Sequence, residues 1–193
     1  FLTAFSVAWG IFMLIILLGA GQGLQNGVTT QFESDAVNSI WIYSGRTSKE
    51  FKGLKPGRPV SFENDDYDET VRLNKTAIEY SSATINIWTN QIISFGKESV
   101  NYRIMGVFPG MGELEQAHII DGRFLNQLDI DNYRKSVVLS EKVRKELFKN
   151  KSAIDEWVNI NSIPFKVIGI FNDASERDNE RVYIPFTDRK SVV

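Results

Sequence analysis

Few residues in this 193-residue sequence could perform chemistry. Cysteine is absent, which excludes a disulfide framework and thiol catalysis. His118 is the single histidine, so a Ser-His-Asp site would have to use it. The sequence contains neither a G-x-S-x-G nucleophile elbow nor an H-E-x-x-H zinc motif. We interpret His118, within the stretch 116–120, as the edge of a strand.

One acidic cluster suggests a metal site, and it consists of Glu63, Asp65, Asp66, Asp68 and Glu69. A calcium loop of the EF-hand type needs oxygen ligands at set spacing around an obligatory glycine, and this cluster has neither. The ATP-binding pattern G-x-x-x-x-G-K-[ST] is also missing. We therefore predict no catalytic, cofactor-binding or metal-ligating residue, and no cofactor in this chain. Trp88 and Trp157 are interpreted as core residues rather than cofactor contacts.

The composition limits the partners. The net charge is −2, the sequence pI is about 5.6 and aromatic residues make up 12% of the chain. A nucleic-acid-binding domain is usually basic, so we expect no nucleic acid partner.

The first twenty residues are apolar and uncharged, whereas the rest of the chain is mixed and polar. As a helix, this stretch is roughly 30 Å long, which matches the hydrocarbon core of a bilayer. The pattern predicts a transmembrane helix over residues 1–22. A cleaved signal peptide and a buried core helix are the alternatives. Because the chain begins with Phe1, we expect it to be part of a longer protein.

An apolar stripe follows the membrane segment, with Leu24, Val28, Phe32, Ala36 and Ile40 at every fourth position. This spacing is typical of an amphipathic helix. We predict that residues 23–37 continue the membrane helix into water as a stalk. Any bend is expected at Gly19, Gly21 and Gly23, since each glycine weakens a helix by about 1 kcal/mol relative to alanine. A plain membrane-exit loop is the alternative.

The remaining sequence predicts an α+β domain. A strand is expected at 40–43, a Gly- and Pro-rich linker after it, and a short helix at 64–74. Further β-branched and aromatic runs predict strands at 78–87, 91–95, 101–108, 136–139, 157–160, 165–171 and 182–185. A helix capped by Ser140 lies among them, with Val143 and Leu147 on its buried face. Strands 102–108 and 165–171 match in chemical type at every position, and each contains a glycine that suggests a bulge or a close backbone approach.

Several of these segments, in their order, resemble one known family. They are the exit from the membrane helix at Gly19, Gly21, Gly23 and Leu24, the strand at 102–108 with Pro109, the 121–124 turn with Asp129, the 137–140 strand end, the helix ending at 146–148, the strand at 165–170, and Val182 to Phe186. Together they are similar to the periplasmic core domain of MacB-type ABC transporter permeases. The resemblance extends over most of the chain.

The resemblance implies a permease subunit in the bacterial inner membrane with its head in the periplasm. It implies a cytoplasmic ABC ATPase subunit or domain, a second permease copy forming a dimer, and a periplasmic adaptor with an outer-membrane channel. ATP hydrolysis would move the membrane helices, and the stalk would carry the motion to the head, which is called mechanotransmission. The chain itself would not be an enzyme.

The expected organisation is a transmembrane helix at 1–22, a stalk helix at 23–37 and a periplasmic core domain at 38–193. A smaller subdomain is expected as an insertion at about 60–120, and the core domain is expected to be truncated at its C-terminus. As residues for mechanical coupling, we select Gly19, Gly21, Gly23, Leu24, Val28 and Phe32. A sensor domain of a membrane receptor is the main alternative function, and a membrane-anchored hydrolase is less favoured.

Overall fold

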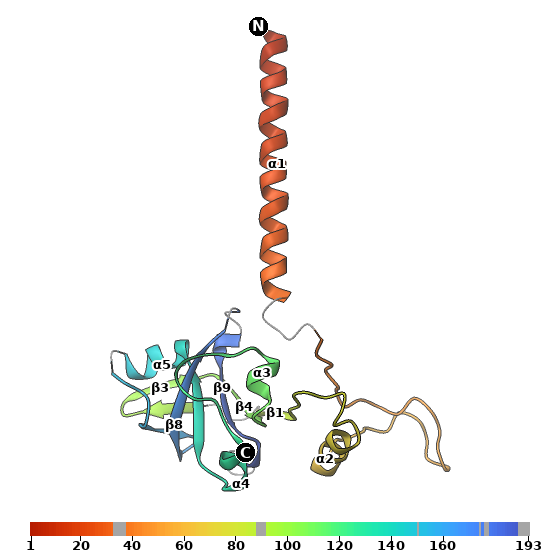
Figure 1. Cartoon of the computed structure of the whole chain (residues 1–193), viewed down its shortest axis with the longest axis vertical. Coiled ribbons are helices and arrows are strands. Elements are labelled where there is room, and N and C mark those ends of the chain that lie inside the picture. Colours follow the sequence, from red (N-terminus) through yellow and green to blue (C-terminus); the bar gives the residue numbers. More distant parts are fainter. Residues whose placement is uncertain (33–37, 88–91, 150, 174, 176–177, 189–193) are drawn as a thin grey trace.

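A computed structural model describes residues 1–32, 38–87, 92–149, 151–173, 175 and 178–188. Figure 1 shows a long N-terminal helix and a head built on a mixed β-sheet. The fold class is therefore α+β with an N-terminal apolar helix, as the sequence predicts. The domain boundaries proposed above remain predictions.

Helix α1 (Leu2–Phe32) is a single uninterrupted helix of 31 residues. Its segment Leu2–Gly27 has a mean hydropathy of 2.3, is long and apolar enough to cross a membrane, and is not buried against other described parts of the chain. An apolar helix this exposed would be unstable in water, since its side chains gain nothing from burial. Its length and composition therefore favour a lipid environment.

Residues 45–60 form a hairpin that projects from the head (Figure 1). Backbone bonds join Thr47 to both Arg58 and Gly57, and Phe51 to Leu54. Helix α2 (Asn64–Leu73) follows, and its predicted position is confirmed. We refer below to residues 45–60 as the basic hairpin.

The strand predicted at residues 40–43 is wrong. These residues have no strand conformation, and Ile40, Ile42 and Tyr43 are at least 70% exposed. Their apolar, β-branched composition suits a strand, but composition alone does not create a strand without a neighbour to accept its backbone hydrogen bonds. Among the described residues, no strand pairs with them.

The described strands form one nine-stranded sheet in the order β1-β4-β9-β6-β8-β7-β2-β3, with β5 also paired to β8. The strands are β1 (Thr84–Ile87), β2 (Ile92–Phe95), β3 (Glu98–Asn101), β4 (Arg103–Val107), β5 (His118–Gly122), β6 (Ser136–Ser140), β7 (Trp157–Ile160), β8 (Ile163–Asn172) and β9 (Arg181–Pro185). The helices of the head are α3 (Met111–Leu114), α4 (Gln127–Asp131), α5 (Glu141–Phe148) and the 3₁₀ turns η1 (Asp178–Glu180) and η2 (Phe186–Asp188). The pairs β4–β9 and β6–β8 are parallel, and the other strand pairs are antiparallel.

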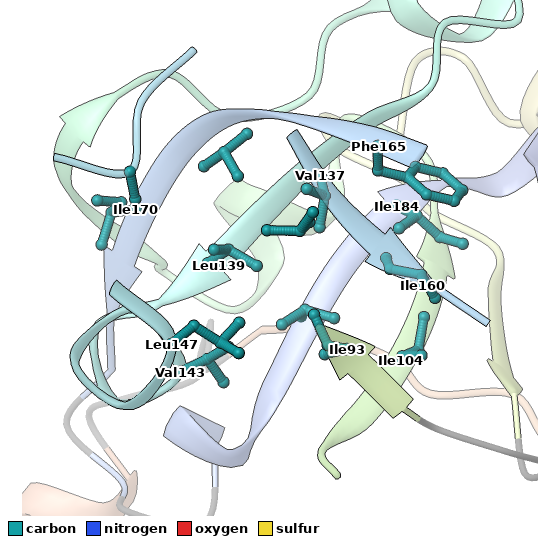
Figure 2. Packing of buried hydrophobic residues seen from close by; sticks show 14 of the residues in the cluster. Ile93, Ile104, Val137, Leu139, Val143, Leu147, Ile160, Phe165, Ile170 and Ile184 are labelled. Carbon is teal, nitrogen blue, oxygen red and sulfur yellow. The ribbon is translucent and has the colours of Figure 1, made fainter. Parts of the chain in front are cut away.

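Both faces of the central strands are buried. On β9, Val182 and Ile184 face the cluster beneath α5, whereas Tyr183 faces a second cluster with Phe171. Figure 2 shows the first cluster, in which Val143 and Leu147 of α5 pack over the sheet. The Ser140 hydroxyl accepts a hydrogen bond from the Val143 amide at 3.3 Å, so the predicted N-cap is confirmed. This burial on both sides explains why the central strands are continuous apolar runs.

Most of the other predicted strands are confirmed, and one is too long. The predictions at 136–139, 157–160, 165–171 and 182–185 match β6 to β9 within about two residues, and those at 91–95 and 101–108 match β2 and β4. The prediction at 78–87 is too long, because only Thr84–Ile87 pairs with β4. In the preceding segment, the hydroxyls of Ser81 and Ser82 bond to Tyr67 and Phe108 instead.

The core assignment of Trp157 is also wrong, because this residue is 54% exposed. Strand β7 alternates, with Val158 and Ile160 buried and Trp157 on the solvent side. Trp88 lies outside the described residues.

The glycine shared by the two matching strands marks a close backbone approach at Gly169 of β8. A Cβ atom there would lie 2.0 Å from the Arg123 carbonyl oxygen. The register of β8 against β6 also shifts at this point, between Val137 and Val138. Backbone atoms cannot move aside as a flexible side chain can, so only glycine fits this position.

We expect Gly169→Ala to lower the free energy of unfolding of the head by about 3 kcal/mol, because the added methyl group must displace the backbone of Arg123, directly after β5. Gly45→Ala is the matched control, since nothing lies within 4 Å of its Cβ position. Thermal unfolding of the detergent-solubilised chain measures both variants. Equal melting temperatures for the two would contradict the close approach.

Candidate functional site

The proposed coupling residues lie along one continuous helix. Gly19, Gly21 and Gly23 are helical, and nothing lies within 4 Å of the Cβ position of any of them. Leu24 is 71% exposed. Figure 1 shows α1 running past these glycines without a bend. The glycines therefore do not break the helix, and they leave its surface open there.

The glycines of α1 form a row on one face of the helix, which was not predicted from the sequence. Gly19, Gly23 and Gly27 are four residues apart and share one face of α1. Small residues at this spacing let a second helix approach closely in a membrane. A search for small residues at positions i and i+4 would have added Gly27 to the set.

Val28 and Phe32 belong to the last turns of α1. Ala36 of the predicted stripe lies outside the described residues, and Ile40 is not helical. The helix thus extends five residues past the end of the apolar span at Gly27. The stalk end at residue 37 remains a prediction.

The head contains a buried charge cluster around Arg181, the first residue of β9. The Arg181 side chain is 6% exposed and donates to the Glu115 carboxylate, which is 8% exposed. Its Nη2 atom also lies 3.4 Å from Asp173, and its Nη1 atom lies 3.2 Å from Asp178. One cation thus holds three carboxylates, which come from the α3–β5 connection, the end of β8 and η1. This cluster ties the connections at one end of the sheet together.

Burial and charge shift the pKa values in this cluster. Burial, the largest influence, lowers the pKa of Arg181, but its interactions with Tyr183, Glu115 and Asp178 outweigh burial and leave the pKa raised. Burial raises the pKa of Tyr183. The guanidinium of Arg181 lies over the Tyr183 ring, 5.5 Å from its centroid. Both groups therefore keep their usual protonation at neutral pH, and the cluster serves structure rather than proton transfer.

A second ion pair fixes the 121–129 segment, which also carries part of the family resemblance. Arg123 donates to both oxygens of Asp129, at 2.6 and 3.0 Å, and the Asp129 side chain is fully buried. The same carboxylate accepts from the Asn126 amide at 3.0 Å and caps α4. Burial, the largest influence, raises the pKa of Asp129, but the bonds from Arg123 and Asn126 and the charge of Arg134 together lower it.

We expect Asp129→Asn to lower the free energy of unfolding by about 2–3 kcal/mol at neutral pH, because charged hydrogen bonds are lost. A carboxyl whose pKa is lowered by folding stabilises the protein above its unfolded pKa, and this stability is lost as the pH falls through the folded value. The difference in free energy of unfolding between the unmodified protein and Asp129→Asn should therefore become smaller as the pH falls below 3.8, the ordinary pKa of an aspartate. Urea unfolding of both proteins at several pH values measures this difference. A difference in free energy of unfolding that does not depend on pH would contradict the role of the ionised Asp129 carboxylate.

The residues considered for chemistry are dispersed. His118 is exposed at the start of β5, opposite Asn172. In the acidic cluster, Asp66 accepts from the Glu63 amide at 2.8 Å and so caps α2. Within the described part of the chain, no three or more His, Cys, Asp or Glu residues are placed to hold a metal ion.

An apolar helix long enough to cross a membrane, followed by an α+β head, is typical of a membrane-anchored domain. The chain belongs to the family of MacB-like periplasmic core domains, whose model matches residues 1–193.

Curated relatives support this assignment. The chain is 24% identical over 191 residues to the macrolide export ATP-binding/permease protein MacB of Shewanella sp. (strain W3-18-1), covering 97% of this chain and 28% of the relative. It is 29% identical over 195 residues to the protein of the same name from Campylobacter jejuni serotype O:23/36, covering 96% and 29%. The chain therefore spans less than a third of the length of these relatives.

Solved structures agree on the fold. The periplasmic region of MacB from Actinobacillus actinomycetemcomitans matches with a TM-score of 0.53 and 26% identity, over 63% of this chain and 55% of that one. The extracellular domain of the ABC-type transporter YknZ from Gram-positive bacteria matches with a TM-score of 0.55 and 19% identity, over 67% and 65%.

Proposed function

We propose that this chain is the periplasmic part, with its first membrane helix, of an ABC transporter permease subunit. In this proposal it couples cytoplasmic ATP hydrolysis to a conformational change of the head, for efflux or export. Family membership and the names of the relatives support the class of transporter.

The continuity of α1 is the observation that carries the coupling proposal. The helix passes from the apolar span Leu2–Gly27 to Phe32 without interruption. An uninterrupted helix transmits a tilt or shift at the membrane to its far end, because its backbone hydrogen bonds resist bending. A flexible exit loop would absorb the same motion.

The proposed partners follow from this role. A cytoplasmic ABC ATPase domain or subunit would supply the energy, and the chain itself would not be an enzyme. A second copy would form the other half of the transporter, and the open glycine face of α1 at Gly19, Gly23 and Gly27 suits such a contact. A periplasmic adaptor and an outer-membrane channel would complete an export assembly anchored in the inner membrane.

Purification of the tagged full-length parent from membranes tests the proposal. We expect an ATP-binding domain in the parent itself or in a chain that co-purifies with it, together with ATPase activity. Recovery of a kinase or a chemotaxis-type module instead, with no ATP-binding cassette, would favour the receptor sensor and contradict the proposal.

A further inference from the structure

The basic hairpin and the adjacent α2 carry opposite charges that are not paired with each other. The hairpin has five cations and one carboxylate, Glu50, so its net charge is +4. Its cations are Arg46, Lys49, Lys52, Lys55 and Arg58, and all are exposed. Residues 63–72 have five carboxylates and one cation, Arg72, so their net charge is −4. We refer to Glu63, Asp65, Asp66, Asp68 and Glu69 as the acidic stretch.

Within the described residues, most charges of the two groups have no ion-pair partner. In the described part of the chain, none of the five hairpin cations forms an ion pair with a carboxylate. In the acidic stretch, Glu69 pairs with Arg72 at 3.1 Å, and the Asp66 carboxylate accepts a hydrogen bond from the Glu63 amide at 2.8 Å. Water and counterions solvate these exposed charges in the isolated chain, so the charges remain available for a contact with another molecule.

The local structure keeps the two groups apart within one chain. The backbone bonds of the hairpin, such as Val60 to Gly45 at 2.8 Å, close it on itself and direct its tip away from the head (Figure 1). Helix α2 is held to the head instead, because Tyr67 stacks on Phe108 at 4.7 Å and bonds to Ser81. Only two residues separate the base of the hairpin from Glu63, and the tip of the hairpin lies away from α2 of the same chain (Figure 1).

The tip of the hairpin also exposes apolar surface. Phe51 is 63% exposed and Leu54 is 48% exposed, and the Lys52 ammonium lies 5.3 Å from the centroid of the Phe51 ring. An aromatic and an aliphatic side chain surrounded by cations are typical of a binding surface with an apolar centre and a charged rim.

We propose that the basic hairpin of one copy binds the acidic stretch of α2 on a second copy. This inference rests on the pairing of two copies in the proposed function and assigns a contact to that pair. In a two-fold dimer, each surface is used once on each copy, so the +4 and −4 groups neutralise each other at two equivalent contacts. An anionic membrane surface would attract the hairpin but repel the neighbouring acidic stretch. A foreign acidic protein would likewise leave the acidic stretch unmatched.

The absence of cysteine allows a direct test on the full-length parent, with any cysteines elsewhere in it replaced. Two differently tagged forms, Lys52→Cys and Asp68→Cys, are co-expressed, and membranes are treated with a short bis-maleimide. We expect cross-linked heterodimers at about fivefold or more above the control pair Lys97→Cys with Asp68→Cys, because Lys97 is exposed in the β2–β3 turn. Cross-linking should also fall at high salt, since salt screens such contacts.

A charge reversal makes the test specific. Adding Lys49→Glu and Lys55→Glu to the hairpin form should abolish the cross-link, and adding Asp65→Lys and Glu69→Lys to its partner should restore it in part, because the net charges then become −1 and +1 in place of +3 and −3. All four positions are exposed, so the head should remain folded, as thermal unfolding would verify.

A pull-down between the two tags separates the possible failures. Co-purification of the two forms with cross-linking no higher than the Lys97→Cys control would overturn the hairpin contact while leaving the pairing of copies intact. No co-purification at all would overturn both. Cross-linking of Lys52→Cys to a different periplasmic protein, in place of the second copy, would also overturn the inference.

Discussion

Replacing Arg181 by methionine should lower the free energy of unfolding of the head by about 3–5 kcal/mol, which is typical when one partner of a buried ion pair is removed. The substitution leaves the carboxylates of Glu115 and Asp173 without their cation, and these side chains are only 8% and 4% exposed. Methionine has a similar length and no charge, so the loss of charge is the main change. Urea unfolding followed by tryptophan fluorescence measures the effect.

The pH dependence of this loss identifies its cause. Without Arg181, burial should raise the pKa values of the two carboxyls above their unfolded values. A carboxyl whose pKa is higher in the folded than in the unfolded state destabilises the fold as the pH rises towards and through its folded pKa. The loss of free energy of unfolding in Arg181→Met should therefore be smaller at about pH 4 than at about pH 7. Arg181→Lys keeps the charge and should lose less stability. An equal loss of free energy of unfolding at both pH values would contradict the electrostatic explanation.

Inserting a Gly-Ser pair between Leu24 and Gln25 should reduce export by about tenfold or more while ATP hydrolysis continues, if α1 transmits motion as a rigid helix. The pair weakens the helix locally by roughly 1.5 kcal/mol relative to two alanines. The position lies inside α1 but outside the head, so the fold of the head should be unaffected.

An Ala-Ala insertion at the same position is the matched control. It adds the same length and the same rotation of about 200° to the helix, yet it preserves helix stiffness. We expect the Ala-Ala variant to export more than the Gly-Ser variant. Export by the Gly-Ser variant at the level of the unmodified transporter would contradict transmission through the helix.

The parts of the fold predicted from sequence are those with strong local patterns. Helix α1 has an uninterrupted apolar run, and strands β6 and β9 are apolar because both of their faces are buried. Helix α5 carries a clear N-cap at Ser140. In these cases, the local sequence was sufficient to predict the element.

The elements that were predicted only in part or missed are short or weakly buried. The strand edge expected at 116–120 overlaps β5, which is mostly exposed and depends on pairing with β8, and the missed α4 has only five residues. The Asn126 and Asp129 capping pair was a usable signal for α4, since such a pair marks a helix start. By contrast, residues 40–43 have strand composition but no neighbouring strand among the described residues.

The charge clusters depend on the tertiary fold. Glu115 and Asp173 meet Arg181 because β4, β8 and β9 bring their segments to one end of the sheet, whereas Asp178 is only three residues from Arg181. No spacing along the sequence indicates the contacts of Glu115 and Asp173 with Arg181. The opposite charges of the basic hairpin and α2 were visible in the sequence, but their separation within one chain required the structure.

If α1 carries motion to the head, the distance between the two heads should change with the nucleotide state of the transporter. A spin label at Lys97→Cys in both copies of the assembled transporter, freed of other cysteines, reports the distance between the two heads by pulsed electron spin resonance. We expect the distance distribution to shift by about 5 Å or more between the nucleotide-free and ATP-trapped states, as is typical of coupled movements of packed elements. Identical distributions in the two states, in a transporter that still hydrolyses ATP, would contradict the proposal that α1 carries motion to the head.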